Sequence, residues 1–213
     1  PKWAPDGGRV VIPYGLPEDF CQAGPLSEPP PPRAVFTSNP LRSLDWLLEL
    51  WAESIQPRVA GAELQVFAGA ATYGSVGVDK EAAMEKVLDR ARALQGQGVK
   101  LRGPVPKARL IQELHQSRAM LYRGDLNETF CLAVGEAQAM GVPAVVEKLG
   151  SVSERVINGE TGFVAAGATA FAEAAKRLLT DDDLWRAQHL AAIEKQRQWR
   201  WADAAAAFEK LIS

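Results

Sequence analysis

Glu128 and Glu136 are the two residues of this 213-residue chain whose types and spacing best suit the binding of a small polar ligand. Glu128 lies in a polar stretch, and Glu136 lies in the run of small residues that follows and ends at Gly141. We predict a loop and then a short helix, in which successive side chains turn by about 100° and eight steps leave a net rotation of roughly 80°. Both carboxylates would then line one side of a cleft at the start of the helix, where unpaired backbone N–H groups favour an anion.

The surrounding stretch, residues 127–146, resembles the E-x7-E signature of retaining, nucleotide-sugar-dependent glycosyltransferases with the two-domain GT-B fold. The matching residues are Glu128, Phe130, Leu132, Glu136, Ala137, Gly141, Pro143, Val145 and Val146. Thr129 and Cys131 depart from the family form, in which glycines are common at both positions. The resemblance extends over roughly residues 34–200, and its specificity is concentrated in this stretch.

The resemblance implies a role for each acid of the motif. It assigns Glu136 to the ribose hydroxyls of the donor and Glu128, as a catalytic residue, to hydroxyls of the transferred sugar. Carboxylates suit both tasks because they accept hydrogen bonds from hydroxyl groups. The resemblance also places the backbone between these acids against the sugar and phosphates, at Thr129, Phe130, Cys131 and Leu132.

The pyrophosphate of such a donor needs positive charge. Relatives carry two basic positions after the first strand. Arg42 matches the second of them and is expected to stabilise the leaving group. The first basic position is absent here, and Ser38 or Asn39 stands in its place. Lys107 and Arg123 lie in other ligand-side loops and would compensate. Residues 101–106 resemble the family segment whose backbone contacts the nucleobase, which implies that Val105 and Leu110 are candidates to pack against the base, with plain core packing an equal alternative.

The elements that must position these residues alternate regularly along the chain. Strands are predicted at 34–38, 64–69, 99–103, 119–122, 144–147 and 162–165. Between the first two, Leu44, Leu47, Leu48, Trp51 and Ile55 follow helical spacing. This alternation favours an α/β fold, a doubly wound, Rossmann-like parallel sheet of about six strands with helices at the carboxyl end of the chain. Ligands of such sheets bind beyond the carboxyl ends of the strands, here in loops 38–43, 69–78, 103–107, 123–130 and 147–151.

Local signals add boundaries to this outline. Residues 9–15 predict a short strand and turn, and residues 151–154 and 180–183 predict capping boxes at two helix starts. We divide the chain into a hinge segment (1–33), a Rossmann-like nucleotide-sugar-binding domain (34–180) and C-terminal helices (181–213) that pack on this domain or on a missing partner. Residues 11–15 resemble the family segment that joins the two domains, which implies an N-terminal domain outside this sequence.

The composition of the chain limits the classes of binding partner that we expect. The net charge of −2 gives no reason to expect nucleic acid, and no apolar run approaches the ~20 residues of a membrane span. The two cysteines lack metal-ligand spacing, so we expect a reducing cytoplasm and no metal site. Peripheral association of the full-length protein with the inner face of the membrane stays open.

The sequence therefore predicts the donor-binding domain of a glycosyltransferase, needing no cofactor beyond its nucleoside diphosphate-sugar substrate. It would transfer a hexosyl unit, with retention, to an acceptor glycan, lipid or small molecule, and the isolated chain should show little or no transfer. The alternatives are a non-catalytic nucleotide-sugar-binding module and a GT-B-like nucleotide-sugar epimerase. A Rossmann dehydrogenase is poorly supported because no G-x-G-x-x-G follows the first strand.

Overall fold

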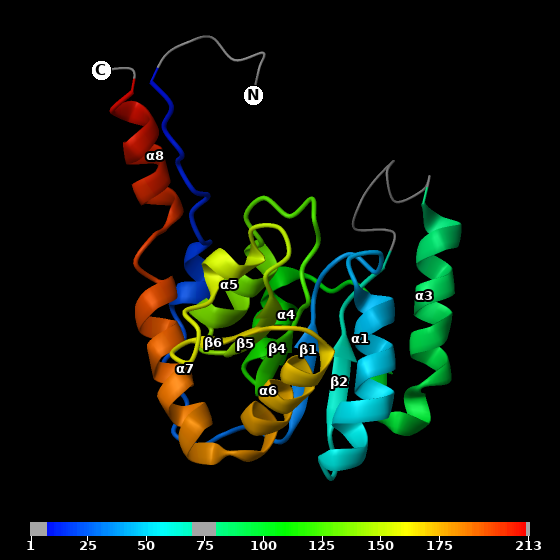
Figure 1. The fold of residues 1–213 in the computed structure, drawn as a ribbon. Coiled ribbons are helices and arrows are strands. Elements are labelled where there is room, and N and C mark those ends of the chain that lie inside the picture. The colour runs from blue at the N-terminus through cyan, green and yellow to red at the C-terminus, as the bar shows by residue number, and fades with distance from the viewer. Residues whose placement is uncertain (1–7, 70–79, 212–213) are drawn as a thin grey trace.

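The chain folds around one parallel β-sheet covered by helices on both faces (Figure 1). The computed structural model describes residues 8–69 and 80–211. Within them the strands are β1 (Arg33–Phe36), β2 (Glu63–Val66), β3 (Val99–Leu101), β4 (Ala119–Leu121), β5 (Ala144–Glu147) and β6 (Gly162–Ala165). They form a six-stranded sheet in the order β3-β2-β1-β4-β5-β6, and every pairing is parallel. The predicted doubly wound α/β fold is confirmed.

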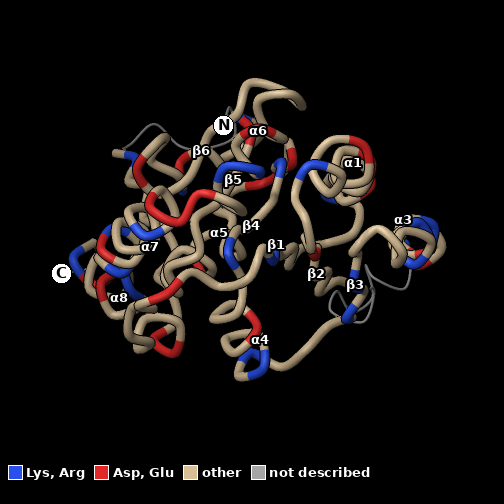
Figure 2. The backbone as a smooth tube through the Cα atoms, turned by 90° about the horizontal axis from the view of Figure 1, so that it is seen from below, with Lys and Arg blue, Asp and Glu red and all other residues tan. Residues whose placement is uncertain are grey.

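The sheet is sandwiched between two helical layers (Figure 2). One layer contains α1 (Leu44–Leu50), α3 (Glu81–Ala93) and α6 (Ala168–Thr180), and the other contains α4 (Lys107–Leu114) and α5 (Leu132–Ala139). The chain ends in α7 (Asp182–Gln196), which packs on α5 and α6, and α8 (Trp201–Glu209). Short helical turns occur at Glu18–Cys21, Trp51–Ile55, Gln56–Arg58, Gln95–Gln97 and Val152–Arg155.

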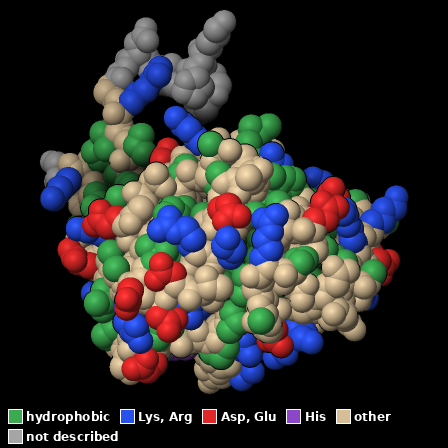
Figure 3. All heavy atoms as spheres, turned by 60° about the horizontal axis from the view of Figure 1, so that its bottom comes forward, with side chains coloured by type: hydrophobic (Ala, Val, Ile, Leu, Met, Phe, Trp, Pro, Cys, Tyr) green, Lys and Arg blue, Asp and Glu red, His purple; other side chains and the backbone are tan. Residues whose placement is uncertain are grey.

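Burial on both faces explains why the strands read as almost continuous apolar runs. Ala34, Val35 and Phe36 of β1 are fully buried, as is every residue of β4. The apolar residues predicted on one helix face, from Leu44 to Ile55, are buried without exception. That helix continues past Leu50 as a π-helical turn and ends in a 3-10 turn that contains Pro57. The face at the amino ends of the strands, by contrast, carries acidic and basic side chains intermixed (Figure 3).

The segment before the sheet corrects one prediction. Residues 9–15 form no strand; the chain runs beside α8, and only Leu16 makes a bridge, to Arg200 (Figure 1). Prolines at 13 and 17 explain this result because they cannot donate a ladder hydrogen bond. Leu16 and Phe20 are nevertheless buried in the core, where Leu16 packs against the glycine face of α5 at Gly135.

Both predicted capping boxes are also wrong in detail. Ser151 makes no capping hydrogen bond, and its buried Oγ has no partner among the described residues. At the start of α7 the cap is Asp181, whose carboxylate accepts from the Leu184 N–H at 3.0 Å. The Thr180 hydroxyl instead donates back to the Lys176 carbonyl, as a threonine in the last turn of a helix can do.

Candidate functional site

The point where the sheet changes direction brings two of the predicted site residues together. The chain winds from β1 outward to β3 and then returns to place β4 beside β1. Arg42 follows β1 and Glu128 follows β4, and Arg42 Nη1 lies 2.6 Å from Glu128 Oε2. In doubly wound sheets this switch point, at the carboxyl ends of the strands, is the place where ligands bind.

Local turns hold Arg42 in this position. The Asn39 side chain accepts from the Leu41 N–H at 2.9 Å, and the Asn39 carbonyl accepts from the Arg42 N–H at 2.9 Å. Ser43 then adopts a left-handed conformation with φ of 60°, and its hydroxyl donates to the Gly124 carbonyl at 2.9 Å. This last bond joins the loop after β1 to the loop after β4, so both sides of the switch point are tied to each other.

Glu128 is held by three donors. Besides Arg42, the Tyr122 hydroxyl donates to Oε2 at 2.9 Å, and the Cys131 N–H donates to Oε1 at 3.2 Å. The Glu128 side chain is only 8% exposed. Burial lowers the pKa of Arg42, but the Glu128 carboxylate and Tyr122 outweigh that effect, and the net pKa is above the usual value. The ion pair therefore joins the loops that follow two adjacent strands, β1 and β4.

Glu136 lies inside α5 and has a different neighbour. Its nearest cation is Lys107, at the start of α4, with Nζ 3.8 Å from Oε1. Burial raises the pKa of the Glu136 carboxyl, and the Lys107 ammonium offsets part of that rise. The structure thus pairs Arg42 with Glu128 and Lys107 with Glu136; the use of both pairs by one ligand stays a prediction.

Cys131 begins α5 in a conformation that explains the glycine common at this position in the family form. Its φ is 58° and its ψ is 69°, in the left-handed region that glycine adopts without strain. The side chain is buried, which raises the pKa of the thiol to about 12 and keeps it protonated at neutral pH. Thr129, at the other position where glycine is common, is exposed and carries no such backbone constraint.

The remaining predicted residues are placed as follows. Val105 and Leu110 are half-buried against the core, and Leu132 is partly exposed at the first position of α5. Arg123, expected to compensate for a missing cation, instead donates to Glu147 at 2.9 Å and lies over the Trp46 ring. The predicted loop 69–78 falls almost entirely outside the described residues. No three His, Cys, Asp or Glu side chains gather as a metal site in the described part of the chain.

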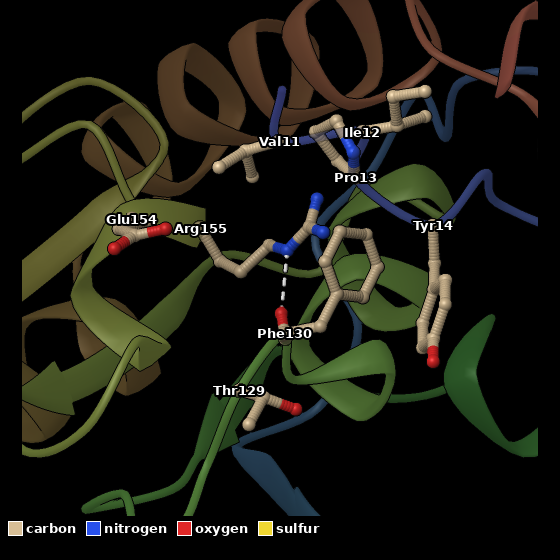
Figure 4. A pocket seen from close by; sticks show the side chains of 8 residues that line it. All are labelled: Val11, Ile12, Pro13, Tyr14, Thr129, Phe130, Glu154 and Arg155. Carbon is tan, nitrogen blue, oxygen red and sulfur yellow. Dashed lines mark hydrogen bonds between the residues drawn. The ribbon is translucent and has the colours of Figure 1, made fainter. Parts of the chain in front are cut away.

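Sequence reasoning missed two features beside the motif. Tyr122 read as the end of a buried strand, yet its hydroxyl reaches Glu128. Phe130 is stacked under the guanidinium of Arg155, at 3.4 Å from the ring centroid, and meets the edge of Tyr14 at 5.3 Å (Figure 4). No spacing rule finds the second group because its members lie more than twenty residues apart in the sequence.

The sheet order defines a Rossmann-like domain of the kind that forms one half of a GT-B glycosyltransferase. The chain belongs to the glycosyl transferases group 1 family, whose model matches residues 32–181. Among curated relatives, the D-inositol 3-phosphate glycosyltransferase of Corynebacterium diphtheriae is 33% identical over 135 residues, covering 62% of this chain and 31% of the relative. The same-named protein of Nocardia farcinica is 29% identical over 169 residues, covering 78% and 36%.

Solved structures show the same fold. Sucrose-phosphate synthase from Thermosynechococcus elongatus superposes with a TM-score of 0.76 at 20% identity, covering 99% of this chain and 54% of that protein. The pneumococcal O-GlcNAc transferase GtfA, in complex with UDP and GlcNAc, gives a TM-score of 0.68 at 13% identity, covering 94% and 38%. In the matches to the two D-inositol 3-phosphate glycosyltransferases, the chain spans about a third of the length of each relative. None of the described helices is long and apolar enough to cross a membrane.

Proposed function

We propose that this chain binds a nucleoside diphosphate-sugar donor and presents it for retaining transfer of a hexosyl unit. The observation that carries the proposal is the contact between Arg42 and Glu128 across the switch point of the sheet. The Arg42 guanidinium suits a pyrophosphate, and the Glu128 carboxylate suits sugar hydroxyls. Both lie at the carboxyl ends of the strands, where doubly wound sheets bind ligands. The complexes of related folds with UDP are consistent with this choice of ligand.

In this proposal each group has a distinct task. Arg42 stabilises the negative charge that develops on the leaving diphosphate, an interaction that strengthens as the sugar–phosphate bond breaks. Glu128 accepts hydrogen bonds from hydroxyls of the transferred sugar, and Glu136 accepts them from the ribose. The donor phosphate itself takes the proton of the acceptor hydroxyl, so this chain supplies no general base. The acceptor, a glycan, a lipid or a small molecule, is bound outside the described residues.

The first test is nucleotide binding by the isolated chain. We expect titration calorimetry to show saturable binding of at least one of UDP, GDP and ADP, because the proposed pyrophosphate and ribose groups all lie on this chain. Binding should weaken as salt is raised, since charge attraction to Arg42 contributes to it. Absence of binding to all three nucleotides would contradict the proposal.

Replacement of Glu136 by glutamine tests the ribose contact separately. We expect nucleotide affinity to fall roughly tenfold, because a hydrogen bond to a charged acceptor contributes about 1.5–3 kcal/mol and an amide retains only part of it. In the parent chain the affinity should also decline on acidification, at a pH above that at which an ordinary glutamate is protonated, since the pKa of Glu136 is raised by burial.

Glu194→Gln is the matched control for this substitution. Glu194 lies on α7 with an exposed side chain that contacts Lys195, and its substitution should change neither the affinity nor its pH dependence. Equal nucleotide affinities for the parent chain and the Glu136 variant would remove Glu136 from the site.

A further inference from the structure

A hollow of about 380 Å³ lies beside the motif, on the side of Phe130 that faces the segment before the sheet (Figure 4). Its volume falls within the range of roughly 300–1,000 Å³ that is typical of small-molecule sites. The walls combine apolar side chains from residues 11–14 with Thr129, Phe130, Glu154 and Arg155. Arg42, Glu128 and Glu136 do not line it, whereas Thr129 and Phe130 do, so the hollow adjoins the proposed donor site without containing its charged residues.

Arg155 is the unusual member of this hollow. Its Nε donates to the Phe130 carbonyl at 2.8 Å, and the guanidinium plane lies over the Phe130 ring. Its two terminal nitrogens form no hydrogen bond or ion pair with any residue in 8–69 or 80–211. Figure 4 shows the guanidinium extending between the Phe130 ring and residues 11–13, while the Glu154 carboxylate lies near the other end of the Arg155 side chain.

Two other half-buried arginines of this chain have a carboxylate or a second carbonyl as a partner. Arg123 also lies over an aromatic ring, that of Trp46, but is paired with Glu147. Arg197 uses its terminal nitrogen to reach the Ala23 carbonyl at 2.7 Å. Arg155 lacks such compensation, and its burial lowers the pKa of the guanidinium to about 10. The terminal nitrogens themselves are not buried, so an anion that enters the hollow can reach them.

We propose that this hollow binds a small organic anion, a phosphate or carboxylate carried on a carbon skeleton of sugar size, through the terminal nitrogens of Arg155. The guanidinium fork matches either anion with two parallel hydrogen bonds. Tyr14, half-exposed beside Phe130, and the apolar residues 11–13 provide the surface for the skeleton. The Thr129 hydroxyl offers one further polar contact.

Arg155→Gln is the decisive variant because glutamine keeps a nitrogen at the position of Nε. It can retain the bond to the Phe130 carbonyl while it removes the charge and both terminal nitrogens. Using calorimetry, we expect the parent chain to bind glucose 6-phosphate or glucuronate, and to bind neutral glucose and inorganic phosphate more weakly. The Arg155 variant should lose roughly ten- to a hundredfold in affinity for the anion that binds. Arg177→Gln, which removes an arginine that lies over the Phe163 ring outside the hollow, should leave the affinity unchanged.

Amide chemical shifts locate the bound anion independently of its affinity. We expect glucose 6-phosphate or glucuronate to shift the resonances of residues 11–16, 129–130 and 154–155. Shifts centred instead on residues 42 and 128 would overturn the proposal, because they would place the anion at the switch point. Equal binding by the Arg155 variant, or binding of glucose or inorganic phosphate as tight as that of both sugar anions, would overturn it as well.

Discussion

The Glu128→Gln variant is expected to bind an intact nucleotide sugar roughly ten- to a hundredfold more weakly than the parent chain, yet to bind the bare nucleoside diphosphate at least as tightly. The two effects have opposite signs because Glu128 has two roles in the proposed site. Its carboxylate accepts hydrogen bonds from the sugar, which are lost with the charge. The same carboxylate occupies Arg42 at 2.6 Å, so its neutralisation leaves that cation more available to a pyrophosphate.

Calorimetry with the tightest-binding nucleotide, and with its sugar conjugate, measures both effects on one preparation. Arg42→Gln is the matched partner, since it should weaken the nucleotide and the nucleotide sugar alike. A Glu128 variant that lost affinity equally for both ligands would indicate that the carboxylate only shapes the loop. Unchanged affinity for the nucleotide sugar would remove Glu128 from the donor site.

Gly141→Ala is expected to lower the free energy of unfolding by about 2–5 kcal/mol, the largest stability effect that we predict for a single methyl group. Gly141 ends α5 with φ of 79°, where any side chain adds strain. A Cβ atom built there would lie 2.3 Å from both Cε1 and Nδ1 of His189. The ring cannot move aside easily, because its Nε2 accepts from the Leu26 N–H at 2.9 Å and it stacks on Trp185.

Gly159→Ala separates strain from overlap in this experiment. Gly159 has φ of 83° but open space around the added methyl group, so its substitution should cost only about 1–2 kcal/mol. Urea unfolding followed by tryptophan fluorescence gives both values under the same conditions. Equal losses in the two variants would show that His189 does not fix the end of α5.

The same contact explains part of the family motif in physical terms. Because the Leu26 N–H donates to Nε2 of His189, the proton of the ring lies on Nδ1, which donates to the Gly141 carbonyl at 2.6 Å. Burial lowers the pKa of His189 and so favours this neutral form. Gly141, one of the residues that match the family motif, thus permits both the left-handed turn after α5 and the close approach of α7.

Cys131 stands where glycine is common in the family form, and α5 still begins directly after this residue. It adopts a left-handed conformation that costs a residue with a side chain roughly 1–2 kcal/mol. The helix that it begins still forms, since the chain is fixed on both sides by β4 and by the buried residues of α5. The substitution therefore changes the cost of the turn and leaves its geometry intact.

The sequence by itself determined the order of strands and helices, the parallel sheet and the location of the motif. These features depend on apolar periodicity and on residues near one another in the chain, which a single sequence displays directly. Resemblance to the family form also pointed to Arg42 after the first strand, and the role of this cation stays a prediction. The capping prediction for α7 was wrong by one residue, because Asp181 rather than Thr180 accepts from the first turn of that helix.

Only the tertiary structure decided which charges meet. Arg42 and Glu128 are 86 residues apart, and they are brought together because β4 returns to the side of β1. The same fold places Arg123 in an ion pair with Glu147. It leaves the terminal nitrogens of Arg155 without a partner in the described residues. Such pairings are contacts between loops from different strands. They depend on which strands become neighbours in the sheet, and the spacing of residues along the chain does not predict that order.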